Sequence, residues 1–173
     1  QLLELWQKEG VNHAHVSKVQ DASTGIYFVT HDTSGHNFSY FRKDSAASQI
    51  TPENLPNTYI ASAKVLHISA ISQAISPSSN DTVNAAIQIA TENKVLISYD
   101  TNLRLKLWSL EQARETVQQT IPFSDFLFPS LEDSILLTGL REPTDIVDFY
   151  LKNGAKLVAL KLGPAGVLLA TEE

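Results

Sequence analysis

A carboxylate, an amide and a guanidinium group follow one another in the segment Asp100–Arg104. The segment comes directly after an apolar run, Val95–Tyr99, which predicts a buried strand. Ligands of parallel α/β sheets bind outside the carboxyl ends of the strands, so this loop is well placed to meet one. Such a loop can hold a polyhydroxylated or anionic ligand, with Arg104 pairing a carboxylate through two hydrogen bonds. The alternative is that Asp100 or Asn102 only caps the turn while Arg104 lies on the surface.

Polar residues also follow the other predicted strands. The apolar runs Val65–Ile68, Phe126–Phe128 and Leu157–Leu160 are followed by Ser69, Ser130–Asp133 and Lys161–Gly163, respectively. Ser130 also suits the N-cap of the helix that follows, and this role alone would explain it. A glycine-rich turn such as Gly163–Gly166 is weak evidence of a phosphate site, because turns need glycine in any case. Its spacing is neither that of a Walker loop nor that of a dinucleotide fingerprint.

Composition excludes several function classes. The 173 residues are 43% hydrophobic and 18% charged, which is typical of a folded domain. The net charge of −6 and the absence of a Lys/Arg cluster argue against nucleic acid and against a membrane surface. Cysteine is absent, so disulfides, thiolate nucleophiles and cysteine-based metal sites are excluded, and a cytoplasmic location fits. The five histidines show no metal-ligand spacing, and His67, inside an apolar run, is expected to be a satisfied core residue.

Strand and helix signals alternate from about residue 60 onward. This alternation predicts right-handed crossovers and a mostly parallel sheet covered on both faces. Ser109 predicts a helix start and Gly139 a helix end. Ser76–Asn80 reads as a loop, with Asn80 or Asp81 capping the helix after it.

The first quarter of the chain has a different pattern. Ile26–Thr30 and Phe38–Arg42 are strand-like runs joined by a turn at Asp32–Gly35, which predicts a hairpin with one open face. A small β-element attached to an α/β sheet often serves as a lid or clamp over a substrate.

Two motifs resemble those of a known family. Asp100–Trp108 resembles the D-x-N-x-R-x-x-L-W stretch of ribokinase-like (PfkB-type) sugar kinases, found in 2-keto-3-deoxygluconate kinases and some fructokinases. Tyr40–Ser48 resembles the Y-x-R-x-x-S-A-A-S run of 2-keto-3-deoxygluconate kinases. The resemblance implies that the keto-deoxy acid is bound by Tyr27, Tyr40 and Arg42 on one side and by Arg104 on the other. A sugar acid, with one carboxylate and several hydroxyls, suits these donors.

Two further matches imply a nucleotide side. Phe128–Gly139 resembles a family segment that usually carries N-x-x-E before a helix, with Ser130 and Asp133 standing here for the Asn and the Glu. Leu160–Gly166 resembles the K-x-G-x-x-G turn that lies against the nucleotide. The resemblance therefore implies ATP and Mg²⁺ as cofactors. ATP would be bound by Asn102, Ser130, Lys161 and Gly163, and Asp133 would reach the metal indirectly, through water.

The resemblance covers essentially the whole chain and implies a ribokinase-like, doubly wound, mostly parallel sheet with a small β-lid. Residues 1–173 are expected to form a partial PfkB kinase domain, with the lid at about 20–45 and the α/β core at about 60–173. The chain starts inside an amphipathic pattern and stops just after a strand, so we expect a fragment truncated at both ends. The family's G-A-G-D stretch, whose Asp is the general base, has no counterpart. No residue is therefore given a catalytic role, and the fragment alone is expected to be inactive.

The resulting prediction is an enzyme that uses ATP to phosphorylate the terminal hydroxyl of 2-keto-3-deoxygluconate. One alternative is a fructokinase or another PfkB sugar kinase, since a neutral sugar needs no second arginine such as Arg42. Another is a non-catalytic sugar-acid-binding α/β module, and a third is a fragment that is not stable alone. Neither nucleic acid nor membrane is an expected partner. The resemblance also implies that the strands from Tyr27 to Arg42 can form a homo-oligomer interface as well as a lid.

Overall fold

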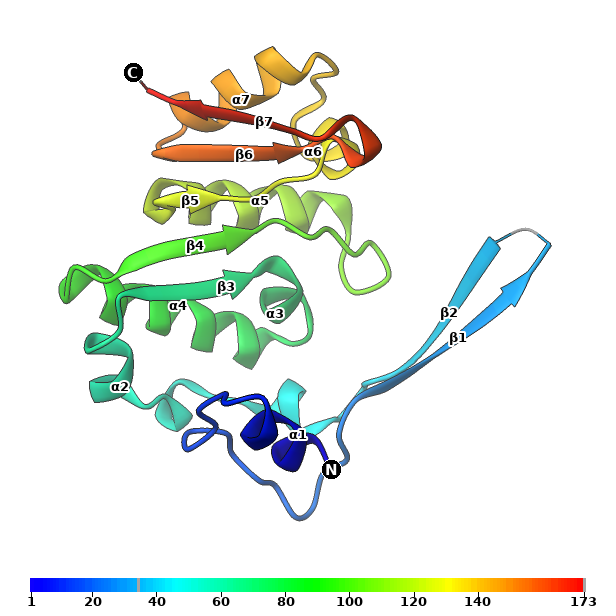
Figure 1. Ribbon diagram of the computed structural model, residues 1–173, viewed down its shortest axis with the longest axis vertical. Coiled ribbons are helices and arrows are strands. Elements are labelled where there is room, and N and C mark those ends of the chain that lie inside the picture. Colours follow the sequence, from blue (N-terminus) through cyan, green and yellow to red (C-terminus); the bar gives the residue numbers. More distant parts are fainter. Residues whose placement is uncertain (34, 173) are drawn as a thin grey trace. The chain divides into compact units, whose positions relative to one another are not determined.

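The computed structural model describes residues 1–33 and 35–172 (Figure 1). The chain divides into two compact units, residues 1–47 and residues 48–173. Within the described part of the chain, no helix is both long enough and apolar enough to span a membrane.

The second unit is built on a five-stranded sheet whose strands lie in sequence order (Figure 1). Its strands are β3 (Val65–Ser69), β4 (Leu96–Asp100), β5 (Phe126–Leu127), β6 (Leu157–Lys161) and β7 (Val167–Thr171). The first four are parallel, and β7 runs antiparallel to β6. Because Ser69 pairs with Asp100 at the ends of β3 and β4, the carboxyl ends of these strands meet at one edge. The predicted mostly parallel sheet is confirmed.

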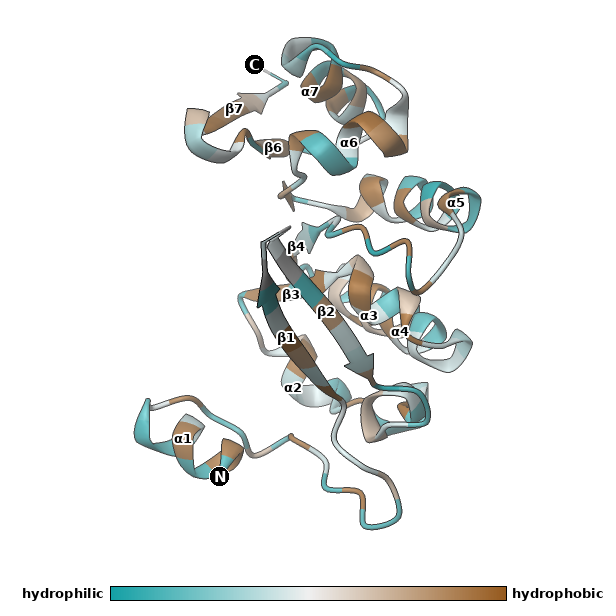
Figure 2. Cartoon of the chain, turned by 90° about the vertical axis from the view of Figure 1, so that its right-hand side faces the viewer, coloured by the Kyte–Doolittle hydropathy of each residue, from teal (hydrophilic) through white to brown (hydrophobic). Residues whose placement is uncertain are grey.

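The helices of this unit precede its first strand or connect successive strands. They are α2 (Asn57–Ala61), α3 (Ala70–Ala74), α4 (Pro77–Glu92), α5 (Leu110–Thr120), α6 (Leu131–Thr138) and α7 (Pro143–Lys152). Short 3₁₀ turns are η1 (Ala46–Gln49), η2 (Pro52–Asn54), η3 (Ile121–Phe123) and η4 (Gly163–Ala165). The longer helices α4, α5 and α7 each carry hydrophobic (brown) and hydrophilic (teal) segments, as Figure 2 shows, and their buried residues join one core.

Helices α3–α7 lie on one face of the sheet (Figures 1 and 2). Each crossover is expected to be right-handed and advances one strand in the same direction, so every connecting helix falls on the same side. Along β4, Ile97 and Tyr99 are buried against the helices, whereas Leu96 is 42% exposed. The sequence predicted helices on both faces of the sheet. The described helices of this unit cover only one face.

The helix boundaries predicted at Ser109 and Gly139 are confirmed, and the one predicted at Asn80 or Asp81 is wrong. Ser109 caps α5, accepting a hydrogen bond from the backbone N–H of Gln112, and Gly139 ends α6 in the left-handed conformation, with φ of 79°. Helix α4, by contrast, begins at Pro77 with Ser76 as its N-cap, so the predicted loop and the caps at Asn80 and Asp81 were wrong. An extended serine before a proline favours a helix start at that point, since proline suits the first helical position.

A buried polar network joins the sheet to two helices. The Tyr99 hydroxyl donates to Gln73 Oε1 at 2.8 Å, and Gln73 Nε2 donates to Thr120 Oγ1 at 3.1 Å. All three residues are buried, and burial raises the pKa of the Tyr99 hydroxyl. Burial likewise raises the pKa of Tyr150 to about 12, and its hydroxyl donates to Ser134 Oγ. These phenols therefore remain neutral donors. Tyr99 joins β4 to α3 and, through Gln73, to α5, whereas Tyr150 joins α7 to α6.

The first unit contains helix α1 (Leu2–Lys8) and a two-stranded hairpin, β1 (Ile26–Asp32) with β2 (Gly35–Phe41). The register pairs Ile26 with Phe41 and Tyr27 with Tyr40. The predicted hairpin is confirmed, although Ser34 of its predicted turn lies outside the described residues.

Replacing Tyr99 by Phe tests the buried network. The Tyr99→Phe variant leaves Gln73 Oε1 without its donor inside the core, which should lower the free energy of unfolding by about 1–3 kcal/mol. Urea unfolding at neutral pH measures this change. Tyr27→Phe, at a tyrosine that is 61% exposed, is the matched control and should change stability little. Equal effects of the two variants would contradict this account of the network.

Candidate functional site

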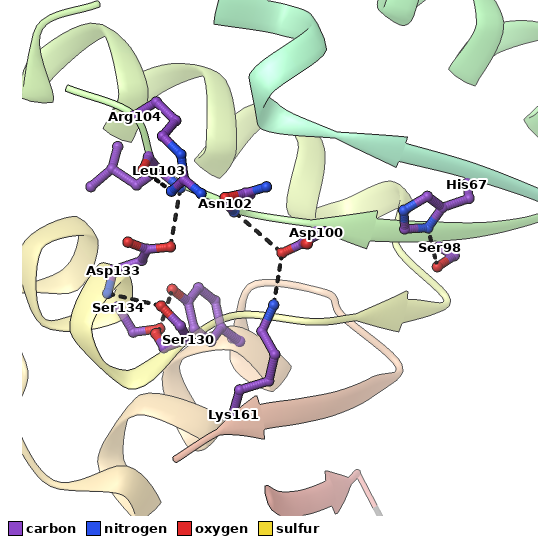
Figure 3. A network of polar contacts seen from close by, with 11 residues as sticks. His67, Ser98, Asp100, Asn102, Leu103, Arg104, Ser130, Asp133, Ser134 and Lys161 are labelled. Atoms are coloured by element: carbon purple, nitrogen blue, oxygen red, sulfur yellow. Dashed lines mark hydrogen bonds and ion pairs between the residues drawn. The ribbon is translucent and has the colours of Figure 1, made fainter. Parts of the chain in front are cut away.

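The carboxyl ends of β4 and β6 and the start of α6 meet at one edge of the sheet (Figure 3). Ser130 forms an isolated parallel bridge with Lys161, and the Lys161 backbone N–H donates to the Pro129 carbonyl at 2.8 Å. This pairing extends the short strand β5 and fixes the start of α6 against the end of β6. The structure thus brings together three polar segments that sequence reasoning placed after separate strands.

An ion pair links two of these segments. Lys161 Nζ lies 3.0 Å from Asp100 Oδ1, with side-chain exposures of 43% and 25%. Asp100 Oδ1 also accepts a hydrogen bond from the Asn102 backbone N–H at 3.3 Å. Asp100 therefore caps the turn, as the alternative interpretation proposed, and in addition contacts the lysine of the glycine-rich turn. Sequence reasoning missed this pair, because the two residues lie far apart in the chain.

The loop after β4 is anchored by alternate residues. Thr101 is fully buried and Leu103 is 5% exposed, whereas Arg104 is exposed. Arg104 Nη1 donates to the Leu103 carbonyl at 2.8 Å, and the Leu103 N–H donates to Asp133 Oδ2 at 3.1 Å (Figure 3). The guanidinium is thus presented outward from a loop whose backbone is fixed, as recognition of an anion requires.

Ser130 and Asp133 occupy the first turn of α6. Ser130 is the N-cap and accepts a hydrogen bond from the Asp133 backbone N–H at 3.1 Å, which is the structural role expected of it. One oxygen of the Asp133 carboxylate accepts a hydrogen bond from the Leu103 backbone N–H. Among the residues that the structure describes, no cluster of three or more His, Cys, Asp or Glu residues forms a metal site. A single carboxylate fits contact with a hydrated Mg²⁺ through water but not direct chelation.

Gly163 begins the turn after β6. Its φ of +60° lies in the left-handed region, and a Cβ built there would meet nothing within 4 Å. The space above its backbone is therefore open, which suits the close approach of a ligand. The turn closes when the Leu162 N–H donates to the Gly166 carbonyl at 2.8 Å.

The hairpin presents Tyr27, Tyr40 and Arg42 on one face. The rings of the paired Tyr27 and Tyr40 are 6.0 Å apart, and the Arg42 guanidinium carbon lies 4.1 Å above the Tyr40 ring centre. Phe38 stacks on Tyr40 at 6.1 Å, so this face carries a third aromatic ring that sequence reasoning missed. The alternation of side chains along a strand, counted from Tyr40, could have found it.

The predicted site residues are divided between the two units. Tyr27, Tyr40 and Arg42 belong to the first unit. The second unit carries the other six predicted residues: Asn102, Arg104, Ser130, Asp133, Lys161 and Gly163.

His67 departs from its prediction in one respect. Its Nδ1 lies 2.9 Å from Ser98 Oγ, so the ring is partnered. The residue is nevertheless exposed, and its placement in the core was wrong. It lies on β3, the first strand of the sheet, on the face that the helices do not cover.

Comparison with known proteins identifies the family of the chain. The family described as pfkB family carbohydrate kinase matches residues 1–173. The chain belongs to this family of carbohydrate kinases. It is 34% identical over 174 residues to the 2-dehydro-3-deoxygluconokinase of Bacillus subtilis (strain 168), covering 98% of this chain and 53% of that protein. It is 33% identical over 163 residues to fructokinase-2 of Solanum lycopersicum, covering 92% of this chain and 48% of that protein.

A solved structure supports the same assignment of fold. The PfkB protein from Polaromonas sp. JS666 is 30% identical and superimposes with a TM-score of 0.93, over 99% of this chain and 58% of that one. The predicted ribokinase-like fold is therefore confirmed. The chain spans about half the length of the curated relatives it matches.

A double-mutant cycle tests the Asp100–Lys161 pair. Asp100→Asn, Lys161→Gln and the double variant should reveal a favourable interaction of about 0.2–1 kcal/mol, as expected for a partly exposed pair. The measurement is urea unfolding of each variant. Combining Asp100→Asn with Lys152→Gln, which removes a lysine from α7, is the control and should give strictly additive effects. An additive result for Lys161 as well would mean that the pair contributes nothing.

Proposed function

We propose that the intact protein transfers the γ-phosphoryl group of ATP to the terminal hydroxyl of 2-keto-3-deoxygluconate. The observation that carries this proposal is the hairpin face on which Tyr27, Tyr40 and Arg42 stand together. A guanidinium held over a phenol ring, with a second phenol beside it, offers donors for a carboxylate and for neighbouring hydroxyls. Residues of about 20–45 act in this proposal as the lid or clamp over the substrate.

Arg104 supplies a second guanidinium in this proposal. It projects from a loop whose Leu103 N–H donates to Asp133 and whose Leu103 carbonyl accepts from the guanidinium itself. Two arginines suit a sugar acid better than a neutral sugar, because only the acid brings a charge to pair. The name of the Bacillus relative, 2-dehydro-3-deoxygluconokinase, supports the same substrate class.

ATP and Mg²⁺ are assigned to the edge formed by β6 and the start of α6. Lys161 offers an ammonium group to phosphate oxygens, and the open backbone at Gly163 offers room for close approach. Asn102 and Ser130 complete the proposed nucleotide side, and Asp133 would contact the hydrated metal only through water. Phosphoryl transfer relies on such positioning and charge stabilisation, and bound Mg²⁺ would neutralise phosphate charge. No residue of this chain is assigned as general base, and we place the reaction in the cytoplasm.

A fructokinase activity is the second candidate. The similarity to fructokinase-2 of Solanum lycopersicum favours it, as does the resemblance of Asp100–Trp108 to a stretch found in some fructokinases. A coupled assay of the intact protein with both sugars separates the two, since a fructokinase would phosphorylate fructose in preference to the keto acid. Binding of the keto acid without turnover of either sugar would favour a non-catalytic module.

Alanine substitution of either arginine tests the substrate assignment. Loss of one charge-assisted contact, worth about 1.5–3 kcal/mol, should raise the KM for 2-keto-3-deoxygluconate roughly ten- to a hundred-fold in Arg42→Ala and in Arg104→Ala. The KM for ATP should change far less than the KM for the acid, because neither arginine is assigned a contact with the nucleotide. Arg141→Ala, at an exposed arginine after α6, is the control. Equal effects on both substrates would count against the assignment.

We further propose that the opposite face of the hairpin forms a homo-oligomer interface. Ile26, Phe28 and Phe41 lie on that face with exposures of 52%, 56% and 59%, and the rings of Phe28 and Phe41 pack edge to face at 5.6 Å. Exposed apolar side chains gathered on one face commonly mark an interaction site. A second copy of the chain would cover them and also protect the strand edges.

Replacing Phe28 by Ser tests this interface. Loss of a buried aromatic anchor of about 2 kcal/mol should weaken self-association roughly thirty-fold in sedimentation analysis of the intact protein. Phe123→Ser, at a phenylalanine of the second unit that is 47% exposed, should leave association unchanged. A monomeric parent protein at micromolar concentration would rule the interface out.

A further inference from the structure

The peptide groups on the two sides of Leu103 connect the start of α6 to Arg104 (Figure 3). On one side the Leu103 N–H donates to Asp133 Oδ2 at 3.1 Å, and on the other its carbonyl accepts from Arg104 Nη1 at 2.8 Å. The Leu103 side chain is 5% exposed, so it anchors this point of the loop in the core. The position of the Arg104 guanidinium therefore depends on backbone that Asp133 holds.

Asp133 is itself fixed to the edge assigned to the nucleotide. Its backbone N–H donates to Ser130 Oγ at 3.1 Å, and Ser130 is bridged to Lys161 on β6. Lys161 in turn reaches Asp100, at the opposite end of the same loop. The loop Asp100–Arg104 is thus held at two points, and both holding groups belong to the segments that carry the proposed nucleotide contacts.

We propose that Asp133 is a positioning residue that couples the affinity of the sugar acid to the binding of the nucleotide. The proposal rests on the proposed function, since it assigns Arg104 to the acid and Lys161 to the nucleotide. A nucleotide that immobilises Ser130 and Lys161 also immobilises Asp133, and through it the Leu103 backbone. The acid then meets a loop that is already ordered, so less conformational entropy is lost when it binds.

Asp133 couples the two sites as a hydrogen-bond acceptor, and the charge that would serve its water-mediated contact with the metal is not needed for the coupling. An asparagine at this position keeps an oxygen that can accept from the Leu103 N–H, whereas an alanine does not. A charge-dependent contact with a hydrated metal ion makes the opposite prediction, because asparagine would then fail as alanine does. The pair Asp133→Asn and Asp133→Ala therefore separates the two roles.

Glu132→Ala is the matched control for these variants. Glu132 is the neighbouring acidic residue in the first turn of α6 and is exposed. Its removal takes away the same charge near the helix N-terminus. Any effect of the helix dipole alone should therefore appear equally in Glu132→Ala.

The measurement is calorimetric titration of the intact protein with 2-keto-3-deoxygluconate, with and without Mg²⁺ and a non-hydrolysable ATP analogue. In the parent protein, in Glu132→Ala and in Asp133→Asn, the nucleotide should tighten acid binding by roughly five-fold or more. In Asp133→Ala the ratio of the two dissociation constants should fall close to one. Thermodynamic reciprocity requires the same ratios when the nucleotide analogue is titrated with and without the acid.

Three outcomes would overturn the proposal. A ratio of one in the parent protein means that the sites are independent, and equal loss in Asp133→Asn and Asp133→Ala means that charge is what matters. If the parent protein binds no keto acid at all, the proposed function is wrong and this proposal is wrong with it. If it binds both ligands independently, only the coupling is contradicted. If thermal unfolding shows that Asp133→Ala is not folded, Asp133→Ser, whose side chain is too short to reach the Leu103 N–H, takes its place.

Discussion

Parallel pairing of β4, β5 and β6 is the constraint on which the rest of the site depends. Parallel strands linked by helices must all begin at one edge of the sheet and end at the other, so the segments that follow them converge. Asp100, Ser130 and Lys161 lie about thirty residues apart along the chain, and only this topology brings them together. The polar residues at this edge do not disrupt the apolar core, which lies beneath them around Tyr99 and its buried partners.

The loop after β4 shows how an anchored backbone presents an exposed side chain. Thr101 and Leu103 point into the protein, and Asn102 and Arg104 alternate with them. The burial of every second residue anchors the loop, while the guanidinium remains exposed to solvent. On the hairpin, by contrast, it is exposed cross-strand aromatic pairs that stabilise the face that carries Arg42.

Much of the fold could be predicted from the sequence because its signals are local. Short apolar runs such as Leu157–Leu160, a cap such as Ser109 and a terminator such as Gly139 depend on nearby residues only. The start of α4 was misjudged because Ser76, Asn80 and Asp81 are all acceptable caps. The proline after Ser76 decides between them.

Candidate residues for the site could be named from the sequence, but their contacts could not. Family motifs identified Arg104 and Lys161, yet the ion pair of Lys161 with Asp100 depends on strand order, which no local pattern encodes. The family resemblance gave Asp133 a water-mediated contact with the metal. Its hydrogen bond with the Leu103 N–H depends on how the loop after β4 packs against α6, which no local pattern encodes. His67 was misplaced for a similar reason, since burial of a strand residue depends on which faces its neighbours cover.

The uncovered face of the sheet has a practical consequence for work with residues 1–173 alone. Val65, Leu96, Val167 and Leu169 are between 42% and 63% exposed, and β3 and β7 are the edge strands of the sheet. Apolar patches next to unpaired strand edges favour self-association into aggregates. A preparation of residues 1–173 would therefore need solubilising substitutions, such as Val65→Lys and Leu169→Lys, before crystallisation or NMR.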